Sequence, residues 1–199
     1  MRHIYIHVPF CSRRCSYCDF SIAVRRDVPA QAFVENVGAE LRTRITNLTS
    51  PALTDVETLY IGGGTPSKLG ALGIQQMYAE LTVSGMRLVP GAEFTMEANP
   101  EDITPAAVAA WREVGVNRLS IGVQSFDADV LSWMHRTHTA ADAATAARVA
   151  RDGGFKDISV DLIYALPERL NRDWDADLSK ALDLAPDHLS LYGLTVEPH

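Results

Sequence analysis

Short apolar runs with the period of a β-strand alternate along the chain with segments that have the period of a helix. The strand-like runs are residues 3–8, 58–61, 93–97, 118–121, 158–162 and 189–192. In the first run Ile4, Ile6 and Val8 occupy every second position, as in a half-buried strand. Regular alternation of strands and helices predicts parallel strands joined by right-handed crossovers, in an open sheet or a barrel. The expected fold class is therefore α/β.

Helical periodicity and capping signals fill the gaps between these runs. Helices are expected over residues 33–45, 74–81, 105–114, 128–134, 140–153 and 174–182. Thr104, Asp127 and Thr139 stand where an N-cap is expected for three of them, because their side-chain oxygens can accept from free backbone N–H groups. Pro105 suits a first helical position, and Gly115 suits the stop that follows.

Composition sets the class of protein. The chain has 199 residues, of which 47% are apolar, and this is enough for one sizeable globular domain over residues 1–199. The net charge is −7 and the basic residues are scattered, which disfavours a nucleic acid as the main partner. No apolar run approaches the ~20 residues of a membrane helix, and no signal peptide is evident. We expect a cytoplasmic protein without an integral membrane segment.

Polar residues follow the predicted strands at their C-terminal ends. All three cysteines follow the first strand, a G-G-G-T-P turn follows the second, Glu97 closes the third, Gln124 follows the fourth, and Asp161 lies near the end of the fifth. Parallel sheets and barrels place their ligand sites at this edge. Glu97 and Asp161 could also be ordinary charges at strand ends. Their shared edge favours a single binding site instead.

The cysteines Cys11, Cys15 and Cys18 have the spacing C-x3-C-x2-C, and no other cysteine exists in the chain. A structural zinc site usually needs four Cys or His ligands, typically as two close pairs, and the chain has no second pair, although His7 could supply a fourth ligand. Three unrelated core cysteines would not gather in one turn. A four-iron cluster takes one protein ligand per iron, so three thiolates leave one iron open. The spacing therefore favours an iron-sulfur cluster, with zinc as the alternative.

The cysteine segment resembles the signature of radical S-adenosylmethionine (SAM) proteins, in which an aromatic residue such as Tyr17 commonly precedes the third cysteine. A narrower resemblance is to the anaerobic coproporphyrinogen III oxidases and their relatives, the radical-SAM heme chaperones. The matching motifs are Y-I-H-V-P-F-C at 5–11, G-G-G-T-P-S at 62–67, S-I-G-V-Q-S-F at 120–126, V-D-L-I-Y-A-L-P at 160–167 and L-S-L-Y-G-L-T-V-E-P at 189–198. Five ordered motifs are far more specific than three cysteines alone.

This resemblance implies a partial barrel of about six βα units and assigns roles to residues. It implies that Cys11, Cys15 and Cys18 hold three irons of a [4Fe-4S] cluster, with SAM on the fourth. Glu97 would bind the amino group of SAM and Arg136 its carboxylate, although Arg136 could also be an exposed charge at a helix end. The other implied cofactor residues are Tyr5, Tyr17, Gly62, Gly63, Gly64, Thr65, Gln124 and Asp161. A tight turn alone could also explain the three glycines.

The resemblance also implies two possible functions. The oxidases use a 5'-deoxyadenosyl radical to decarboxylate coproporphyrinogen III, and the chaperones bind heme as cargo and transfer it to acceptor proteins. The oxidases carry a long N-terminal segment and a fourth cysteine two residues after the third, where this chain has Phe20. We therefore expect a heme chaperone, with the oxidase as the alternative. The implied partners are a heme or porphyrin ligand, an acceptor protein and an electron donor. The ending inside a motif predicts a chain truncated after strand six.

Overall fold

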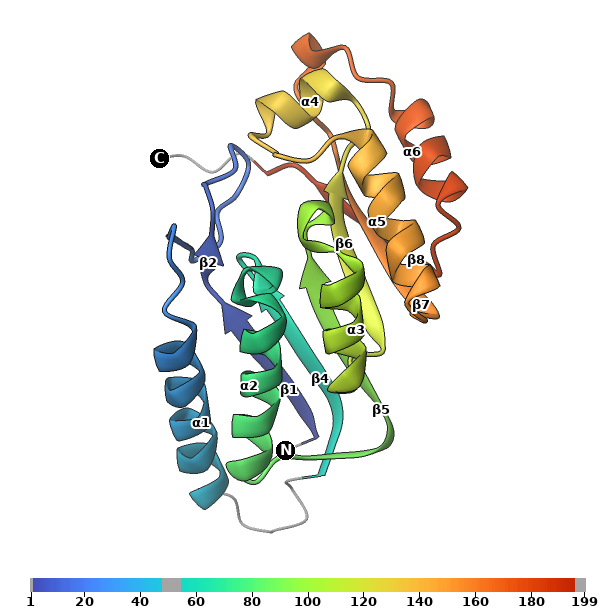
Figure 1. Cartoon of the computed structure of the whole chain (residues 1–199). Coiled ribbons are helices and arrows are strands. Elements are labelled where there is room, and N and C mark those ends of the chain that lie inside the picture. The colour runs from blue at the N-terminus through green and yellow to red at the C-terminus, as the bar shows by residue number, and fades with distance from the viewer. Residues whose placement is uncertain (1, 48–54, 196–199) are drawn as a thin grey trace.

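The computed structural model describes residues 2–47 and 55–195, and a six-stranded parallel sheet forms its centre (Figure 1). The strands lie in the order β1-β4-β5-β6-β7-β8. Their bounds are His3–Val8 for β1, Asp55–Gly63 for β4, Arg87–Ala98 for β5, Arg118–Gln124 for β6, Asp157–Tyr164 for β7 and His188–Gly193 for β8. All six predicted strands are confirmed; β1 has the bounds of its apolar run, and the other five are longer than theirs. Residues 196–199, on which the predicted truncation depends, lie outside the described residues.

The six predicted helices are also confirmed. They are α1 (Ala30–Thr46), α2 (Gly70–Val83), α3 (Pro105–Glu113), α4 (Ala128–Trp133), α5 (Ala140–Asp152) and α6 (Trp174–Asp183). Thr104, Asp127 and Thr139 are the N-caps of α3, α4 and α5, and each side chain accepts from a backbone N–H in the first turn. Among the described residues, none of these helices has both the length and the apolar character needed to cross a bilayer.

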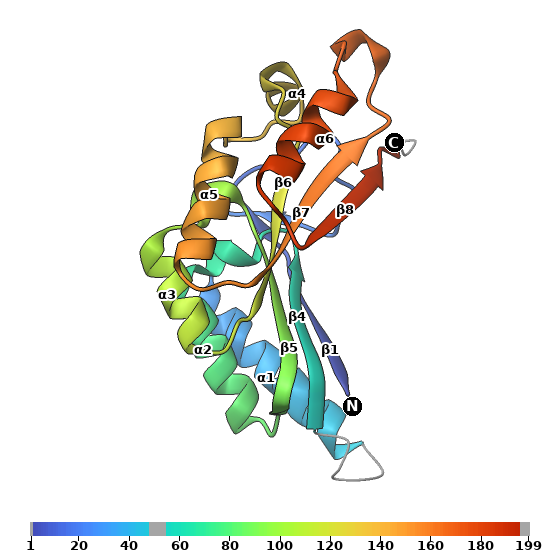
Figure 2. The same cartoon turned by 90° about the vertical axis from the view of Figure 1, so that its right-hand side faces the viewer.

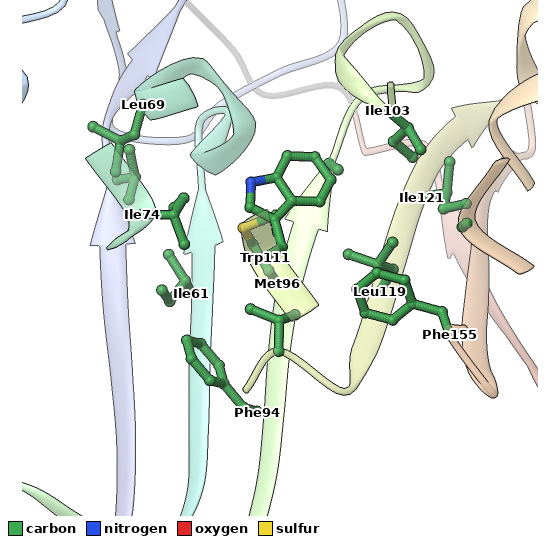
Figure 3. Close-up of a cluster of buried hydrophobic side chains, with 14 of the residues drawn as sticks. Ile61, Leu69, Ile74, Phe94, Met96, Ile103, Trp111, Leu119, Ile121 and Phe155 are labelled. Carbon is green, nitrogen blue, oxygen red and sulfur yellow. The ribbon is translucent and has the colours of Figure 1, made fainter. Parts of the chain in front are cut away.

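The helices cover one face of the sheet (Figure 2). Each strand pairs with the one before it in the order, and right-handed crossovers then place successive helices on the same side. Apolar residues on alternate strand positions face these helices, and a buried core forms between the two layers. Figure 3 shows its centre, where Trp111 of α3 packs over Met96 of β5. Both side chains are at most 1% exposed.

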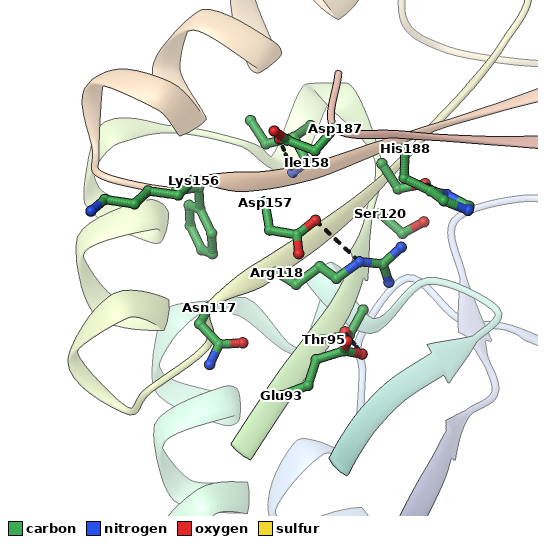
Figure 4. A network of polar contacts seen from close by, with 12 residues as sticks. Glu93, Thr95, Asn117, Arg118, Ser120, Lys156, Asp157, Ile158, Asp187 and His188 are labelled. Atoms are coloured by element: carbon green, nitrogen blue, oxygen red, sulfur yellow. Dashed lines mark hydrogen bonds and ion pairs between the residues drawn. The ribbon is translucent and has the colours of Figure 1, made fainter. Parts of the chain in front are cut away.

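The opposite face of the sheet has a different chemistry. Its strand positions, matched by the parallel register, are His3, Tyr5, His7, Thr58, Tyr60, Glu93, Thr95, Glu97, Arg118, Ser120, Asp157, Ser159, Asp161, His188, Ser190 and Tyr192. Figure 4 shows part of it, where Arg118 Nε lies 3.3 Å from Asp157 Oδ1. Closed (β/α) barrels instead fill their interior with branched aliphatic side chains. We call this helix-free surface the polar face.

Ala165, just after β7, has a left-handed backbone with φ of 57°. This conformation is unfavourable for a residue with a Cβ, and glycine adopts it without that penalty. Ala165 is exposed, so removing its methyl group loses little packing. We expect Ala165→Gly to raise the free energy of unfolding by about 1 kcal/mol, measured by urea unfolding.

Ala144, exposed on the right-handed helix α5, provides the matched control. Glycine in a helix interior is unfavourable because it loses more backbone entropy on folding. Ala144→Gly should therefore lower the free energy of unfolding by about 1 kcal/mol. The same sign in both variants would contradict the strain at Ala165.

Candidate functional site

The cysteine loop lies beyond the end of β1 and is anchored on both sides. Cys11 ends the short strand β2 (Phe10–Cys11), which pairs in parallel with β3 (Ala23–Val24). This ribbon was not predicted, because two residues are too few to show a strand period. At the other side, Ser16 Oγ donates to the carbonyl of Trp133 at 2.8 Å. Tyr17 packs against a small cluster formed by Val130, Met134 and Ile163.

The glycine turn is shaped by close approach as well as by backbone conformation. A Cβ on Gly64 would lie 2.9 Å from Cys11 Sγ and from the backbone of Pro9. Gly63 has φ of 118°, and a Cβ there would meet His7 at 2.7 Å. Distances this short are not tolerated between packed heavy atoms. The glycines therefore form a tight turn, which is the other explanation that the sequence offered for them. They also allow the backbone to lie against Cys11.

The strand ends surround one cavity of about 460 Å³. Its lining includes most of the predicted site residues, namely Cys11, Cys15, Tyr17, Cys18, Gly63, Gly64, Thr65, Glu97, Gln124, Arg136 and Asp161. These residues come from the first five predicted strands and the segments that follow them. The structure thus brings together side chains that are up to 150 positions apart in the sequence. The expected gathering at one edge of the sheet is confirmed.

Two predicted residues are not part of the cavity lining. Tyr5 lies on the polar face with its side chain 58% exposed, and its ring is 5.8 Å from that of Tyr60. Gly62 lies behind Glu97, where a Cβ would come within 2.8 Å of Glu97 Oε1. The space at Gly62 is thus already filled by the carboxylate. The contribution of Tyr5 to cofactor contact stays a prediction.

Two carboxylates face the cavity from neighbouring parts of the polar face. Glu97 accepts from the hydroxyl of Tyr60 at 2.9 Å and from the backbone N–H of Gly63 at 2.9 Å. Asp161 accepts from Ser120 Oγ at 2.9 Å. Burial raises the pKa of both carboxyl groups, because the charged form loses hydration there. Each oxygen has two lone pairs, so both carboxylates retain capacity for further donors from a ligand.

Arg136 lines the cavity from the segment that follows α4. Its Nη2 atom donates to Asn99 Oδ1 and to the carbonyl of Gly122, both at 2.8 Å, while Nη1 lies 3.9 Å from Cys15 Sγ. Its Nε atom is buried without a hydrogen-bond partner among the described residues. A buried guanidinium N–H ordinarily has an acceptor, so this orphan donor fits an anionic group. Arg136 is therefore not the exposed helix-end charge that the sequence left open.

Sequence reasoning missed a group of residues behind the cavity wall. Gln124 has a left-handed backbone with φ of 68°. This conformation cannot be predicted from the sequence for a residue other than glycine. Arg172 lies behind Gln124, 6% exposed, and forms an ion pair of 2.6 Å with Asp177. Arg172 Nη2 also lies 3.5 Å from the carbonyl of Gln124, and Asp177 accepts from the N–H of Phe126 at 2.8 Å. This buried pair holds the turn that follows β6.

The donor set fits an iron-sulfur cluster better than a single metal ion. All three cysteines are free thiols around one cavity, and Thr65 Oγ1 lies 3.5 Å from Cys11 Sγ. Within residues 2–47 and 55–195, no three His, Cys, Asp or Glu side chains converge to hold one ion. A four-iron cluster needs no such convergence, because each thiolate binds a different iron. The zinc alternative would need His7 beside the cysteines, whereas His7 Nε2 lies 2.8 Å from the carbonyl oxygen of Ser21.

A parallel α/β sheet with a three-cysteine loop at its C-terminal edge defines a class of α/β proteins whose site suits an iron-sulfur cluster. The profile of the radical SAM superfamily matches residues 5–181. The chain belongs to the radical SAM superfamily. Membership implies a [4Fe-4S] cluster and SAM as cofactors.

Relatives within the superfamily point to one branch. The chain is 36% identical to the "Heme chaperone HemW" of Bacillus subtilis (strain 168), covering all of this chain and 52% of that protein, and 37% identical to the protein of the same name from Escherichia coli (strain K12), covering 98% and 51%. It thus spans about half the length of these relatives. Among solved structures, coproporphyrinogen III oxidase (HemN) from Escherichia coli superposes with a TM-score of 0.82 at 28% identity, over 99% of this chain and 44% of that one. The resemblance to this branch is confirmed.

Proposed function

We propose that this chain is the radical SAM core, over residues 1–199, of a cytoplasmic heme chaperone that binds heme and passes it to an acceptor protein. The observation that carries the proposal is Phe20, which stands two residues after Cys18 where the oxidase pattern has a fourth cysteine. Relatives that bear the name heme chaperone support it. The same proposal requires two partners, an acceptor protein for the heme and an electron donor for the cluster.

The cavity residues have separable roles in this proposal. Cys11, Cys15 and Cys18 hold the cluster, which supplies one electron to SAM when both are bound. Glu97 accepts from the amino group of SAM, and Arg136 donates to its carboxylate through Nε. The backbone of the glycine turn contacts the methionine part, Gln124 and Asp161 bind the ribose hydroxyls, and Tyr17 lines the cofactor. The anchored loop and the cavity walls exclude water from these groups.

Removing either charge of this clamp should weaken SAM binding. Glu97→Gln keeps the shape that Tyr60 and Gly63 require, and Arg136→Met keeps most of the side-chain volume. Charge-assisted hydrogen bonds in a partly dry site contribute about 1.5–3 kcal/mol, so SAM affinity should fall about tenfold or more in each variant. Isothermal titration calorimetry of the cluster-loaded chain would measure it.

Glu35, exposed on α1 and remote from the cavity, provides the matched control. Glu35→Gln makes the same change of charge as Glu97→Gln and should leave SAM affinity unchanged. Iron content has to be equal in all variants, because cluster loss would also weaken binding. Wild-type affinity in both Glu97→Gln and Arg136→Met would identify the two residues as ordinary charges at the edge of the sheet.

The oxidase alternative is favoured by a specific likeness, the superposition on coproporphyrinogen III oxidase. A decarboxylase has to hold its substrate with the reacting atoms within ~3.5 Å, whereas a carrier of heme has no such requirement. The two functions therefore differ in turnover. Both need the same cofactor cavity, so its geometry supports either one.

One experiment separates the two functions. The full-length protein that contains this chain, loaded with cluster and SAM, is titrated with heme and, in parallel, incubated anaerobically with coproporphyrinogen III and a reductant. We expect stoichiometric heme binding and no release of carbon dioxide. Steady carbon dioxide release coupled to SAM cleavage would establish the oxidase. The 199-residue chain alone should bind heme more weakly, and equal affinity would place the whole heme site on these residues.

A further inference from the structure

The cysteine loop and the ribbon beside it gather positive charge on a chain that is negative overall. Residues 11–27 contain four arginines and two aspartates, while the whole chain has a net charge of −7. The arginines are Arg13, Arg14, Arg25 and Arg26, and all four are exposed. We call these four residues the arginine patch.

The fold brings the two arginine pairs to the same place. Strands β2 and β3 run in parallel, with Cys11 opposite Val24, and the N–H of Arg25 donates to the carbonyl of Cys11 at 2.9 Å. Because the strands are parallel, both segments leave the ribbon at the same end. One pair follows Cys11 after a single residue, and the other pair follows Val24 directly.

The patch is not neutralised by the protein itself. Arg14 Nη1 donates to the carbonyl of Cys18 and Arg25 Nη1 to that of Val24, each at 3.2 Å. Across residues 2–47 and 55–195, none of the four arginines forms an ion pair with a carboxylate. Other exposed arginines do form such pairs, for example Arg2 with Glu57, Arg44 with Glu40 and Arg87 with Asp55. The positive potential of the patch is therefore available to a partner.

Exposed apolar side chains accompany the charge. Phe20 is 62% exposed, and Val24, next to Arg25, is 46% exposed. Phe20 also lines the mouth of the cavity together with Arg13 and Cys18. Arginine and aromatic residues are enriched where proteins bind one another, and arginine charge alone would serve for a small anion. This composition favours, as the partner of the patch, a protein with an acidic surface.

We propose that the arginine patch docks an acidic one-electron carrier protein that reduces the cluster. This inference rests on the proposed function, in which the cluster passes one electron to SAM. The carrier is oxidised by one electron and the cluster is reduced by one, with no proton or group transferred. Docking at the patch puts the carrier on the loop that holds all three cysteines.

The test uses flavodoxin, a small acidic flavin protein, as the probe. The cluster-loaded chain is mixed anaerobically with photoreduced flavodoxin, and cluster reduction is followed by stopped-flow absorbance. Arg25 and Arg26 lie outside the cavity lining, so R25Q/R26Q leaves the site intact. At low salt its second-order rate should fall about tenfold, because rim charges act mainly on association. At ~0.5 M salt the difference should largely disappear.

A second readout does not depend on the loaded cluster. Binding of oxidised flavodoxin to the chain without cluster, measured by fluorescence anisotropy at low salt, should also weaken in R25Q/R26Q. The matched control is R44Q/R148Q, which removes the same two charges from exposed positions on α1 and α5. Both readouts should be unchanged in the control.

The outcomes separate the docking surface from the proposed function. A chain that forms no cluster, or a cluster that dithionite cannot reduce, would contradict the proposed function. A dithionite-reducible cluster whose reduction by flavodoxin is equally fast in R25Q/R26Q and wild type would overturn the docking surface. So would a loss of heme affinity in R25Q/R26Q with an unchanged flavodoxin rate, because the patch would then bind heme propionates.

Discussion

Cys15→Ala is expected to abolish retention of the iron-sulfur cluster, and Cys11→Ala and Cys18→Ala should do the same. With one thiolate lost, one more iron has no protein ligand, and the loop cannot replace it because the sequence has no other cysteine. The measurement is iron and sulfide per chain after anaerobic reconstitution, together with the electron paramagnetic resonance signal of the reduced form. Wild type should give four irons and four sulfides and a signal that shifts with SAM.

The fold should survive these substitutions. Cys15 and Cys18 lie outside the main core, and Cys11, though 8% exposed, is at its margin. Circular dichroism and urea unfolding without cluster should therefore be close to wild type. Ser12→Ala, one residue from Cys11 and exposed, is the control that keeps the full cluster. Zinc as the only tightly bound metal in anaerobically purified wild-type protein would contradict the cluster.

Arg172→Met should destabilise the fold more than any exposed substitution discussed above. It removes the partner of Asp177, which is 2% exposed, and leaves an unpaired charge inside the protein. Breaking a buried ion pair in this way lowers the free energy of unfolding by about 3–5 kcal/mol. A domain of this size should then melt roughly 6–20 °C lower. Urea unfolding and differential scanning calorimetry would measure the loss.

Two further variants identify the cause of that loss. Arg172→Met with Asp177→Asn removes the unpaired charge and keeps an acceptor for the N–H of Phe126, so it should be more stable than Arg172→Met alone. Arg2→Met breaks an exposed pair with Glu57 and should lower the free energy of unfolding by less than about 1 kcal/mol. Equal losses in Arg2→Met and Arg172→Met would show that burial of the pair is unimportant.

The sequence predicted the sheet and the edge at which the site forms because both depend on periodicity. In β6, Leu119 and Ile121 alternate with Ser120 and Gly122, and this alternation decides which side chains join the apolar core. The N-caps at Thr104, Asp127 and Thr139 could also be predicted, since each involves hydrogen bonds only to the first turn of its own helix. Site residues at the ends of different strands could then be placed together without knowing their contacts.

The remaining features depend on contacts between distant segments. Cys11 pairs with Val24 between two strands of only two residues each. The left-handed backbone of Gln124 is held by Arg172, which lies 48 positions away in the sequence. Neither has a periodic or compositional signal. The placement of Tyr5 outside the cavity lining likewise depends on how far along β1 the cavity reaches. Residue type and spacing do not predict how far the cavity extends along the strand.

The division of the sheet into an apolar and a polar face has a consequence for how this protein can change. Side chains that hold the fold together project toward the helices, and those available to ligands project the other way. Substitutions at exposed positions of the polar face, such as Tyr192, which also lines the cavity, can therefore vary the ligand without touching the packed layer. Adaptation to a new ligand and maintenance of folding stability are thus largely independent problems in this architecture. A library confined to the exposed positions of this face, such as Tyr5 and Tyr192, would sample new binding chemistry on a scaffold that stays folded.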